Sequence, residues 1–477
     1  MIMKKSINSF PAACAALLAL CFSSVLVAQQ KSLPDAPKTQ LIASIGQASM
    51  AGASQSAAPP SGTVAAQPPS GAKLTLAQAE RIAIQNNPNI SVARLLALAQ
   101  AQVTREAQSQ YMPYATSDLI AADGNQNGRI TGAGTLNSPR VFSKAAGGLT
   151  VSQLITDFGR THTLVRSAQS KAKAQLENER ATELDIKLTV DQAFYQTLTA
   201  QAVLRVAQET VAQRQATVDQ VSALTKAQLR SDLDLSFADV QLSRAKLMLL
   251  DAQNQADNAM TAFNDVLGFE KDQRYILVDQ ASSNPQPPPT DADALLPTAF
   301  GQRPDLAALN DNYLSARQYT TAERDLWMPT ISALAAVGAA PIRADHILTS
   351  WYGAAGANVE IPVFNGFLYN AREQAAKMRA NAAREQVRNL RDMIARDLRI
   401  AVLNSQTAFQ RIGVTHEMLN QANFSLSLAQ ARYKLGLGGI VELTQAELSQ
   451  TQAQIDYTNA RYAYQTSLAE VNYQLGQ

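Results

Sequence analysis

The apolar residues of this chain follow two different periods, one of seven residues and one of two. In two long blocks they recur every seven residues, as in Leu204, Val211 and Val218 and again in Ile412, Leu419, Leu426 and Tyr433. Spacing of this kind is typical of helices packed side by side as coiled coils. No Gly or Pro lies between Gly159 and Gly268, so the predicted helices are much longer than the usual length of about 11–12 residues.

Each long block has a turning point near its middle. The second block has three glycines in the four residues 436–439, which end a helix and allow a tight reversal. The equivalent stretch of the first block, 226–232, ends in a Ser-Asp pair that can cap the returning helix. We therefore predict long helical hairpins over 160–267 and 367–475, whose arms each have about 55–65 residues and extend for some 80–100 Å.

Two shorter segments have the two-residue period of β-strands, and two others with poor alternation are their expected partner strands. From Trp351 to Val363 the odd positions are apolar or small, whereas the even positions include polar residues such as Tyr352, which suits a strand between lipid and water. The predicted strands cover about 114–123, 148–156, 330–340 and 351–363. We expect both tryptophans, Trp327 and Trp351, together with Tyr352, at a membrane interface. A small soluble sheet that caps a helical bundle is the alternative.

Four strands do not close a membrane barrel, which needs about eight. Open strand edges do not survive in lipid either, so several copies of the chain would have to contribute strands to one barrel. No segment after residue 28 offers the roughly 18 unbroken apolar residues of a membrane-spanning helix. If this protein is integral to a membrane, it must therefore enter as a closed barrel.

An internal duplication organises the chain. We assign a first structural repeat to 74–268 and a second to 296–477, each consisting of a helix, two strands and a long hairpin. The proline-rich segment 269–295 links the two repeats. The matching pairs are Asn87-Pro88 with Arg303-Pro304, Tyr111-Met112-Pro113 with Trp327-Met328-Pro329, and Leu267-Gly268 with Leu475-Gly476.

The N-terminus has the form of an export signal. Two lysines precede an apolar stretch over 12–27, and Ala28 is a suitable cleavage point, which gives a signal peptide over 1–28. A retained membrane helix is the alternative. Residues 29–73 are rich in Ala, Ser, Gln, Gly and Pro and form a predicted flexible tail. Both cysteines lie inside the signal, and we expect an N-terminus without lipid.

Charge and composition argue against catalysis and against nucleic-acid binding. The chain has 41 basic and 39 acidic residues, so it carries no overall attraction for nucleic acid. Its histidines, His162, His346 and His416, are scattered without the spacing of metal ligands. The glycine clusters are not followed by phosphate-binding residues. We therefore predict that the chain is not an enzyme and has no cofactor and no metal site.

With these features assembled, the sequence resembles the TolC family of outer-membrane efflux proteins over about 74–477. The resemblance implies a fold that is mainly α with a small membrane β-barrel. Long antiparallel coiled-coil hairpins would form an α-barrel in the periplasm, and four strands per subunit would complete the twelve-stranded β-barrel of a homotrimer in the outer membrane. The residues that carry the resemblance are Asn87-Pro88, Arg303-Pro304-Asp305-Leu306, Ile361-Pro362-Val363-Phe364-Asn365-Gly366, Tyr433-Lys434-Leu435-Gly436-Leu437 and Ala446.

The resemblance also implies a function and partners. The subunit would belong to the passive exit duct of a tripartite efflux or type I secretion system. A periplasmic adaptor (membrane fusion) protein and an inner-membrane transporter, either a proton-driven RND pump or an ABC-type exporter, would open the duct at its periplasmic tip. The alternative is a periplasmic coiled-coil adaptor or scaffold protein. Adaptors also carry helical hairpins, but they add lipoyl-like and small β-barrel modules that nothing in this sequence resembles.

Family members dock the adaptor through the tips of their helical hairpins. The equivalent positions are Leu229 in the first half and Leu435, Gly436 and Leu437 in the second. The second tip keeps the Gly-Leu pattern of the family. The first tip departs from it, with Ala-Gln at 227–228 where Val-Gly is usual.

The resemblance further implies an acidic entrance just beyond the tips. Asp234 and Glu442 occupy the acidic positions, and Gln445 stands where some members carry a second acid. Three copies of two carboxylates would form a ring of about six negative charges, which attracts cations and repels anions. Alternatively, Asp234 and Glu442 are acids at helix starts, where the helix dipole favours them.

Family members also hold the closed tip with polar contacts that involve a tyrosine and an arginine. Tyr433 matches the tyrosine, whereas Gly438 stands where some members have the arginine. This difference makes Arg230, on the other tip, the candidate for holding the closed state.

Overall fold

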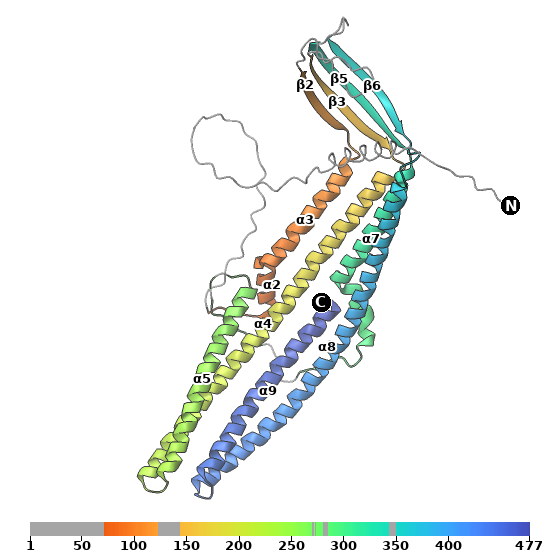
Figure 1. Cartoon of the computed structure of the whole chain (residues 1–477). Helices are drawn as coiled ribbons and strands as arrows, with labels where there is room; N and C mark the ends of the chain where they lie inside the picture. Colours follow the sequence, from red (N-terminus) through yellow and green to blue (C-terminus); the bar gives the residue numbers. More distant parts are fainter. Residues whose placement is uncertain (1–70, 123–143, 270, 272, 280–284, 343–349) are drawn as a thin grey trace, which may run out of the picture. The chain divides into compact units, whose positions relative to one another are not determined.

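The computed structural model describes residues 71–122, 144–269, 271, 273–279, 285–342 and 350–477. The predicted signal peptide and nearly all of the predicted tail lie outside the described residues. The described chain belongs to one compact unit, Thr63–Gln477. It contains long helices, a sheet of four strands and a sheet of two strands (Figure 1).

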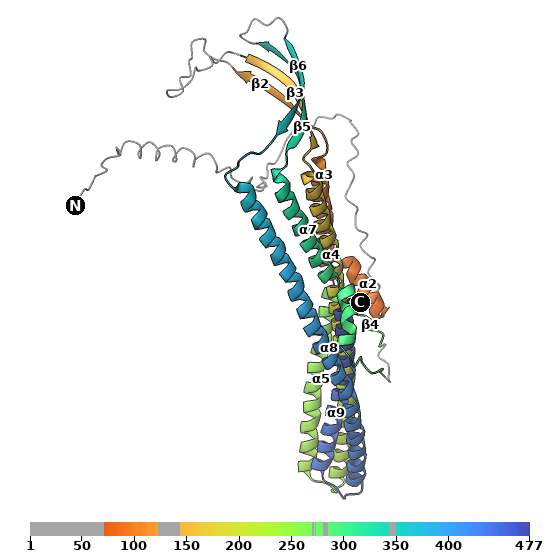
Figure 2. The same ribbon diagram turned by 90° about the vertical axis from the view of Figure 1, so that its right-hand side faces the viewer.

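Two helical hairpins make up most of this unit. Helices α4 (Arg160–Lys226) and α8 (Leu368–Lys434) have 67 residues each, whereas α5 (Asp232–Val266) has 35 and α9 (Ile440–Leu475) has 36. The arms therefore measure about 100 Å and about 50 Å, so the prediction of two arms of similar length was wrong. The α4–α5 and α8–α9 turns lie at the same end of the helices (Figures 1 and 2).

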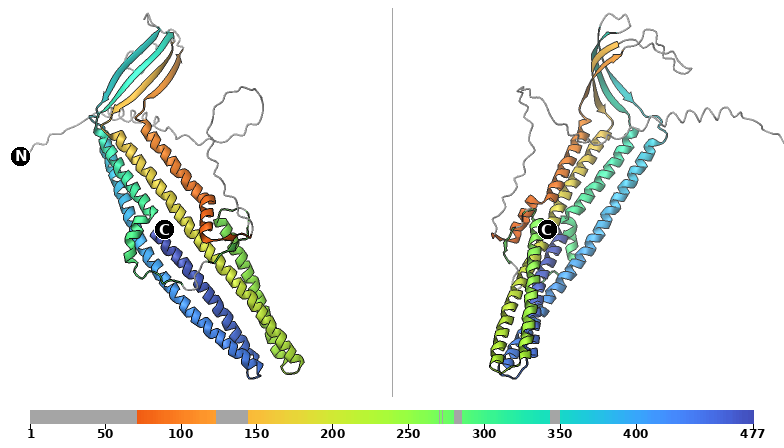
Figure 3. Two further views of the ribbon diagram at one scale, coloured as in Figure 1. Left: turned by 180° about the vertical axis from the view of Figure 1, so that it is seen from behind. Right: turned by 60° about the vertical axis from the view of Figure 1, so that its left-hand side comes forward.

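Shorter helices extend along the parts of α4 and α8 that α5 and α9 do not reach. The first repeat contributes α2 (Leu76–Asn86) and α3 (Pro88–Ser109), and the second contributes α6 (Leu296–Gln302) and α7 (Pro304–Arg324). Helix α3 packs on α4, while α7 packs on both α4 and α8 (Figure 3). The beginning of α3 meets the end of α5, and the beginning of α7 meets the end of α9.

Two glycines allow these end-to-end junctions. Gly268 and Gly476 have φ angles of 80° and 81°, which a residue with a Cβ rarely adopts. A Cβ on Gly268 would lie 2.9 Å from the backbone carbonyl of Asn86, and a Cβ on Gly476 would lie 2.8 Å from the carbonyl carbon of Gln302. Asn87 also donates a hydrogen bond of 3.2 Å to a carbonyl at the end of α5. The duplicated Leu-Gly and Asn-Pro or Arg-Pro motifs are thus the two sides of each junction.

The linker between the repeats joins a small sheet that the sequence did not predict. Strand β1 (Lys73–Leu74) pairs in parallel with β4 (Ile276–Leu277), and the 3-10 helix η1 (Asp293–Leu295) precedes α6. Leu74, Tyr275 and other apolar residues of this region pack on α2, α4 and α5 in one buried cluster. The beginning of the linker is therefore held against the first repeat at the middle of the long helices, whereas its end packs on α8 and α9.

The larger sheet is antiparallel, with its strands in the order β2, β3, β5 and β6. Their bounds are Tyr114–Ala122, Lys144–Thr156, Thr330–Ile342 and Trp351–Glu360. The 3-10 helix η2 (Asp325–Trp327) precedes β5. Strand β6 ends at Glu360, before the predicted end at Val363, because Pro362 has no N–H to donate to a neighbouring strand.

The register gives this sheet one apolar face and one mostly polar face, since direct partners on neighbouring strands point to the same side. The apolar face carries Leu119, Leu149, Val151, Ile331, Val337, Trp351 and Val359. The opposite face carries Thr116, Asp118, Thr150, Ser152, Thr330, Ser332, Tyr352, Asn358 and Glu360. A few residues do not fit, for example Gln153 on the apolar face and Leu334 on the polar one.

The helices bury their apolar residues in three clusters along their length. One lies around α2, α4 and α5, one around α6, α8 and α9, and one joins the two hairpins near their turns. The third cluster contains Val221 of α4, Ala238 of α5, and Tyr433 and Leu443 of the second hairpin. Within the described ranges, no helix is both long and apolar enough to cross a membrane.

Candidate functional site

The two hairpin turns have the same backbone geometry despite their different sequences. Leu229 N donates to Leu224 O at 2.9 Å in the first turn, and Leu437 N donates to Arg432 O at 2.8 Å in the second. Such six-residue closures end a helix around one residue in the left-handed conformation. That residue is Gly436 in the second turn, with φ of 74°, and Gln228 in the first, with φ of 59°.

The departure of the first tip from the family pattern therefore leaves the fold of the turn unchanged. Gln228 carries a Cβ in a conformation that costs a side-chain-bearing residue about 1–2 kcal/mol. The predicted docking residues project from these turns, since Leu229, Leu435 and Leu437 are 70%, 73% and 68% exposed. Large apolar side chains at such exposure are unfavourable in water unless a partner covers them.

Arg230 of the first tip reaches the second tip. Its Nη2 donates to Tyr433 O at 3.1 Å and more weakly to Gly438 O at 3.4 Å. The guanidinium also lies 4.5 Å from the centre of the Tyr433 ring, within cation–π range. Tyr433 is buried. Burial raises its pKa above the usual value; Arg230 opposes this rise, and Asp234 adds to it. The structure thus brings together Arg230 and Tyr433, the two residues proposed from the sequence for holding the closed tip.

The predicted acidic positions have different surroundings. Asp234 lies in the first turn of α5, where Ser231 caps the helix by accepting a hydrogen bond from Asp234 N at 3.3 Å. Glu442 is in the first turn of α9 and pairs with Arg432 at 3.2 Å, with both side chains about half exposed. Gln445 is exposed one turn further along α9. Because surface ion pairs are worth about 0–1 kcal/mol, Glu442 remains free to change partners.

The sequence reasoning missed a buried ion pair behind the tips. Arg214 of α4 and Glu447 of α9 form a salt bridge with side chains only 5% and 1% exposed. Thr217 donates a hydrogen bond of 3.0 Å to the same carboxylate. Burial lowers the pKa of Arg214 to about 10, which still leaves the guanidinium charged at neutral pH. The sequence offered one signal, because both charged residues lie on the buried stripe of their helix. Arg214, for example, lies between Thr210 and Val221, which are buried on α4.

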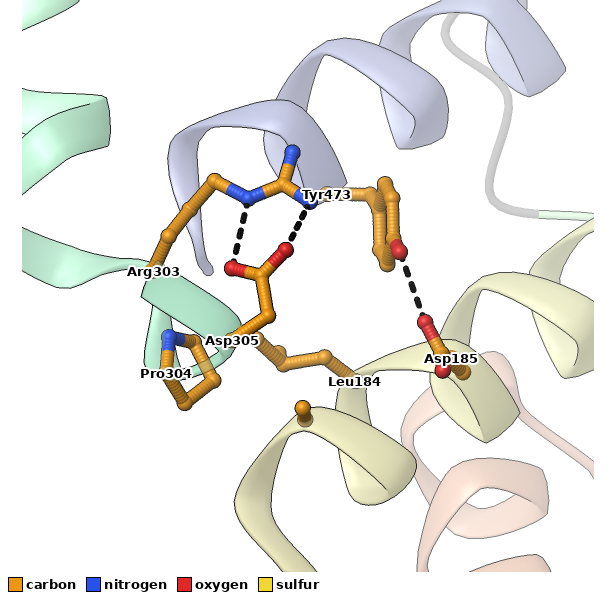
Figure 4. A pocket seen from close by; sticks show the side chains of 7 residues that line it. Leu184, Asp185, Arg303, Pro304, Asp305 and Tyr473 are labelled. Carbon is orange, nitrogen blue, oxygen red and sulfur yellow. Dashed lines mark hydrogen bonds and ion pairs between the residues drawn. The ribbon is translucent and has the colours of Figure 1, made fainter. Parts of the chain in front are cut away.

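A second polar cluster ties the repeats together further along the helices (Figure 4). Arg303 binds both oxygens of Asp305, at 3.0 and 2.7 Å, and donates to Gln474 at 2.5 Å. The hydroxyl of Tyr473 donates to Asp185 at 2.6 Å. Burial is the main cause, and this hydrogen bond the second, of a rise in the pKa of Tyr473 to about 12. The Arg-Pro-Asp motif thus joins the start of α7 and the end of α9 to α4, around a cavity of about 80 Å³.

Comparison with known proteins assigns these features to a family. A family model described as "Outer membrane efflux protein" matches residues 81–268 and 295–477. The chain belongs to this family. The outer membrane protein TolC of Salmonella enteritidis is 23% identical over 425 residues, which cover 84% of this chain and 83% of that protein. The cation efflux system protein CusC of Escherichia coli K12 is 22% identical over 406 residues, covering 81% and 83%.

Solved structures of efflux channels have the same fold. A crystal structure of CusC superimposes with a TM-score of 0.73 at 20% identity, covering 84% of this chain and 92% of that one. The outer membrane protein VceC of Vibrio cholerae gives a TM-score of 0.69 at 20% identity, with coverages of 84% and 96%. The predictions of a TolC-like fold, an outer-membrane location and a role as an efflux duct are therefore confirmed.

The three aromatic residues predicted at the membrane interface of this efflux protein differ in orientation. Trp351 is 66% exposed on the apolar face of the sheet. Trp327, in η2 just before β5, packs edge-on against Tyr369 at 5.6 Å between ring centres. Tyr352, by contrast, belongs to the polar face. Trp351 and Tyr352 therefore lie on opposite faces of the sheet, and the assignment of these residues to a membrane interface stays a prediction.

Proposed function

We propose that three copies of this chain close into one duct through the outer membrane, and that a periplasmic adaptor and an inner-membrane pump open this duct at the hairpin tips. The subunit itself does no chemistry, in keeping with relatives that are channel proteins. The choice of cargo lies with the inner-membrane pump, which is of the RND or the ABC type. The duct contributes a closable passage for that cargo.

The edges of the four-stranded sheet carry this proposal. Among the residues that the structure describes, β2 and β6 are the outermost strands of the sheet, and each pairs with one neighbouring strand. The sheet also has an apolar face suited to lipid and a polar face suited to water. Strand edges that face lipid would leave backbone groups unsatisfied. Pairing β6 of one copy with β2 of the next closes twelve strands around a polar lumen.

The helices give independent support for assembly. Along α5, Leu233, Val240 and Leu247 recur every seven residues and are 64%, 49% and 62% exposed. Val441 and Leu448 of α9 repeat the spacing at 63% and 51%. An exposed seven-residue stripe is the seam of a coiled coil without its partner. Neighbouring copies that pack on these seams would complete an α-helical barrel.

Within such a trimer, we propose that the tips form the gate. Asp234 and Glu442 of three copies would line the entrance and favour cations, while Arg230 would keep the two tips of each subunit together. The exposed leucines Leu229 and Leu437 would dock the adaptor, whose binding would separate the tips. The two acids can line the pore and also stabilise the start of a helix through its dipole, because both roles require an exposed carboxylate in the first helical turn.

Two measurements test the assembly and the gate. Purified protein in detergent should have the mass of three subunits and form cation-selective pores in planar bilayers. A monodisperse monomer that stays folded and soluble without detergent would contradict the trimer.

Replacing Asp234 and Glu442 with Ala should weaken block by divalent cations added at the tip side, whereas Glu209→Ala, on the helix above the tips, serves as the control. Unchanged block in the double variant would remove both acids from the pore.

Docking is tested separately through the exposed leucines. Leu437→Glu places a charge where an apolar contact is proposed and should abolish export in cells while the trimer remains intact. Leu448→Glu, on the predicted seam between subunits, should instead reduce the amount of trimer. Export that persists in Leu437→Glu would exclude this tip from docking.

A further inference from the structure

One row of the four-stranded sheet carries an aromatic ring and a carboxylate. Asp118, Gly148, Gly338 and Tyr352 are successive direct partners across β2, β3, β5 and β6. Direct partners point to the same side, which here is the polar face. The adjoining row on the side of the helices has only small side chains, Thr116, Thr150, Ala336 and Ala354, whereas the row on the other side carries Ile120. The ring of Tyr352 is therefore the largest group at this level of the polar face.

The two glycines make room for this ring. A Cβ on Gly338 would lie 2.5 Å from both the Cζ and the Oη of Tyr352, and a Cβ on Gly148 would collide with the same Oη. The ring therefore lies across the backbones of two neighbouring strands, an arrangement in which an aromatic side chain covers glycines of a sheet. Tyr352 remains 43% exposed, so the ring face turned away from the sheet stays open.

The hydroxyl of Tyr352 ends near Asp118. It occupies the place of the Cβ that Gly148 lacks, and Asp118 is the direct partner of Gly148 on β2. The Cβ atoms of direct partners lie about 4.5–5.5 Å apart. The carboxylate of Asp118 is exposed and belongs to the same row of the polar face as the phenol. An open aromatic face and a negative charge thus adjoin on one surface.

We propose that Tyr352 and Asp118 form a binding row for organic cations in the outer part of the duct. An open ring face attracts an alkylammonium group through its quadrupole and its apolar surface, and the adjacent carboxylate supplies the opposite charge. Tyr352 is the second residue of β6, so the row lies toward the end of the sheet that is remote from α8 and from the acidic tips. The inference rests on the proposed trimer, in which three such rows face a common lumen.

The test uses purified full-length trimers in planar bilayers, with tetrapentylammonium added in turn to each side. Tyr352→Leu removes the ring but keeps an apolar side chain, and Asp118→Asn removes the charge but keeps the shape. Each should weaken block from the side opposite the tips. For Tyr352→Leu the expected factor is about two- to fivefold, the value for one exposed cation–π contact. Tyr352→Phe should retain the block. Thr150→Ala, in the adjoining row, is the matched control and should leave it unchanged.

A second variant tests the placement of the ring without removing it. The Cβ of Gly148→Ala would displace the far end of the Tyr352 side chain, which should lift the ring into the lumen and lower the conductance. In the double variant Gly148→Ala/Tyr352→Leu this decrease should disappear. Equal block in the wild type, Tyr352→Leu and Asp118→Asn would overturn the inference and leave the proposed duct intact. A wild-type protein that forms no pore would overturn the proposed duct and this binding row with it.

Discussion

The buried ion pair between the hairpins allows a sharp test of how one subunit is held together. Arg214→Met leaves the carboxylate of Glu447 buried without a cation, and Glu447→Leu leaves the guanidinium buried without an anion. Removing one partner of a buried pair costs about 3–5 kcal/mol, whereas replacing both with apolar residues is neutral or stabilises by about 1–4 kcal/mol. Each single variant should therefore be much less stable than the double variant Arg214→Met/Glu447→Leu.

The size of the folded unit converts these energies into melting temperatures. For a unit such as Thr63–Gln477, an unfolding entropy of about 2.1 cal/mol/K per residue sums to roughly 0.9 kcal/mol/K, so a loss of 3–5 kcal/mol lowers Tm by roughly 3–6 °C. Thermal unfolding of the detergent-solubilised protein, followed by circular dichroism, measures this shift. The double variant should melt at or above the wild-type temperature.

The exposed pair Arg432 and Glu442 provides the matched control. Both of its side chains are about half exposed, so Arg432→Met should change Tm by less than about 1 °C. The reasoning would be refuted if Arg214→Met and Glu447→Leu behaved like this surface variant. It would also be refuted if the double variant were as unstable as the sum of the two single variants, because the penalty would then not arise from an unpaired buried charge.

Three further predictions concern the tips and the middle of the helices. Arg230→Ala removes two hydrogen bonds and a ring contact between the tips, worth about 1–3 kcal/mol, and should raise the conductance of pores in bilayers; unchanged conductance would contradict its role. Gln228→Gly relieves a left-handed residue and should stabilise by about 0.5–1 kcal/mol in thermal unfolding, whereas Gly436→Gln should destabilise by a similar amount. Burial and, secondarily, Glu80 raise the pKa of Asp191 to about 7. The folded state therefore binds more protons than the unfolded state between pH 4 and 7, and the contribution of this site to stability falls as the pH rises through that range. Asp191→Asn should have its smallest effect at about pH 4 and should be clearly stabilising at about pH 8, and equal effects at both values would contradict the shift.

The long helices and the strands could be predicted because their signals are local. A block without Gly or Pro and with apolar residues every seven positions specifies a long helix wherever it packs. Alternation over ten residues likewise specifies a strand with two unlike faces. The bounds were less certain, as shown by β6, which ends at Glu360 because of a proline that the alternation alone does not weigh.

The unequal arms of the hairpins could not be predicted from period alone. The end of α5 is set by Gly268, whose positive φ and missing Cβ fit it against Asn86 of another helix. Both sides of this junction appeared in the duplication, as Leu267-Gly268 and Asn87-Pro88, but a repeat does not say which of its motifs touch. The ion pair of Arg214 with Glu447 was missed for the same reason, because its partners lie on helices of different repeats.

The two repeats have the same order of helices and strands, and their hairpin turns differ in sequence where the tips meet. Arg230 and Gly438 occupy equivalent positions of the two turns, so one tip carries a long cation and the other carries no side chain. A Cβ on Gly438 would lie 3.0 Å from Glu442 and 3.4 Å from Arg432, and the carbonyl that this glycine presents accepts a hydrogen bond from Arg230. If both tips carried an arginine at this position, two guanidinium groups would face each other, and their like charges would repel. Divergence of the duplicated turns is therefore what allows one tip of a subunit to bind the other.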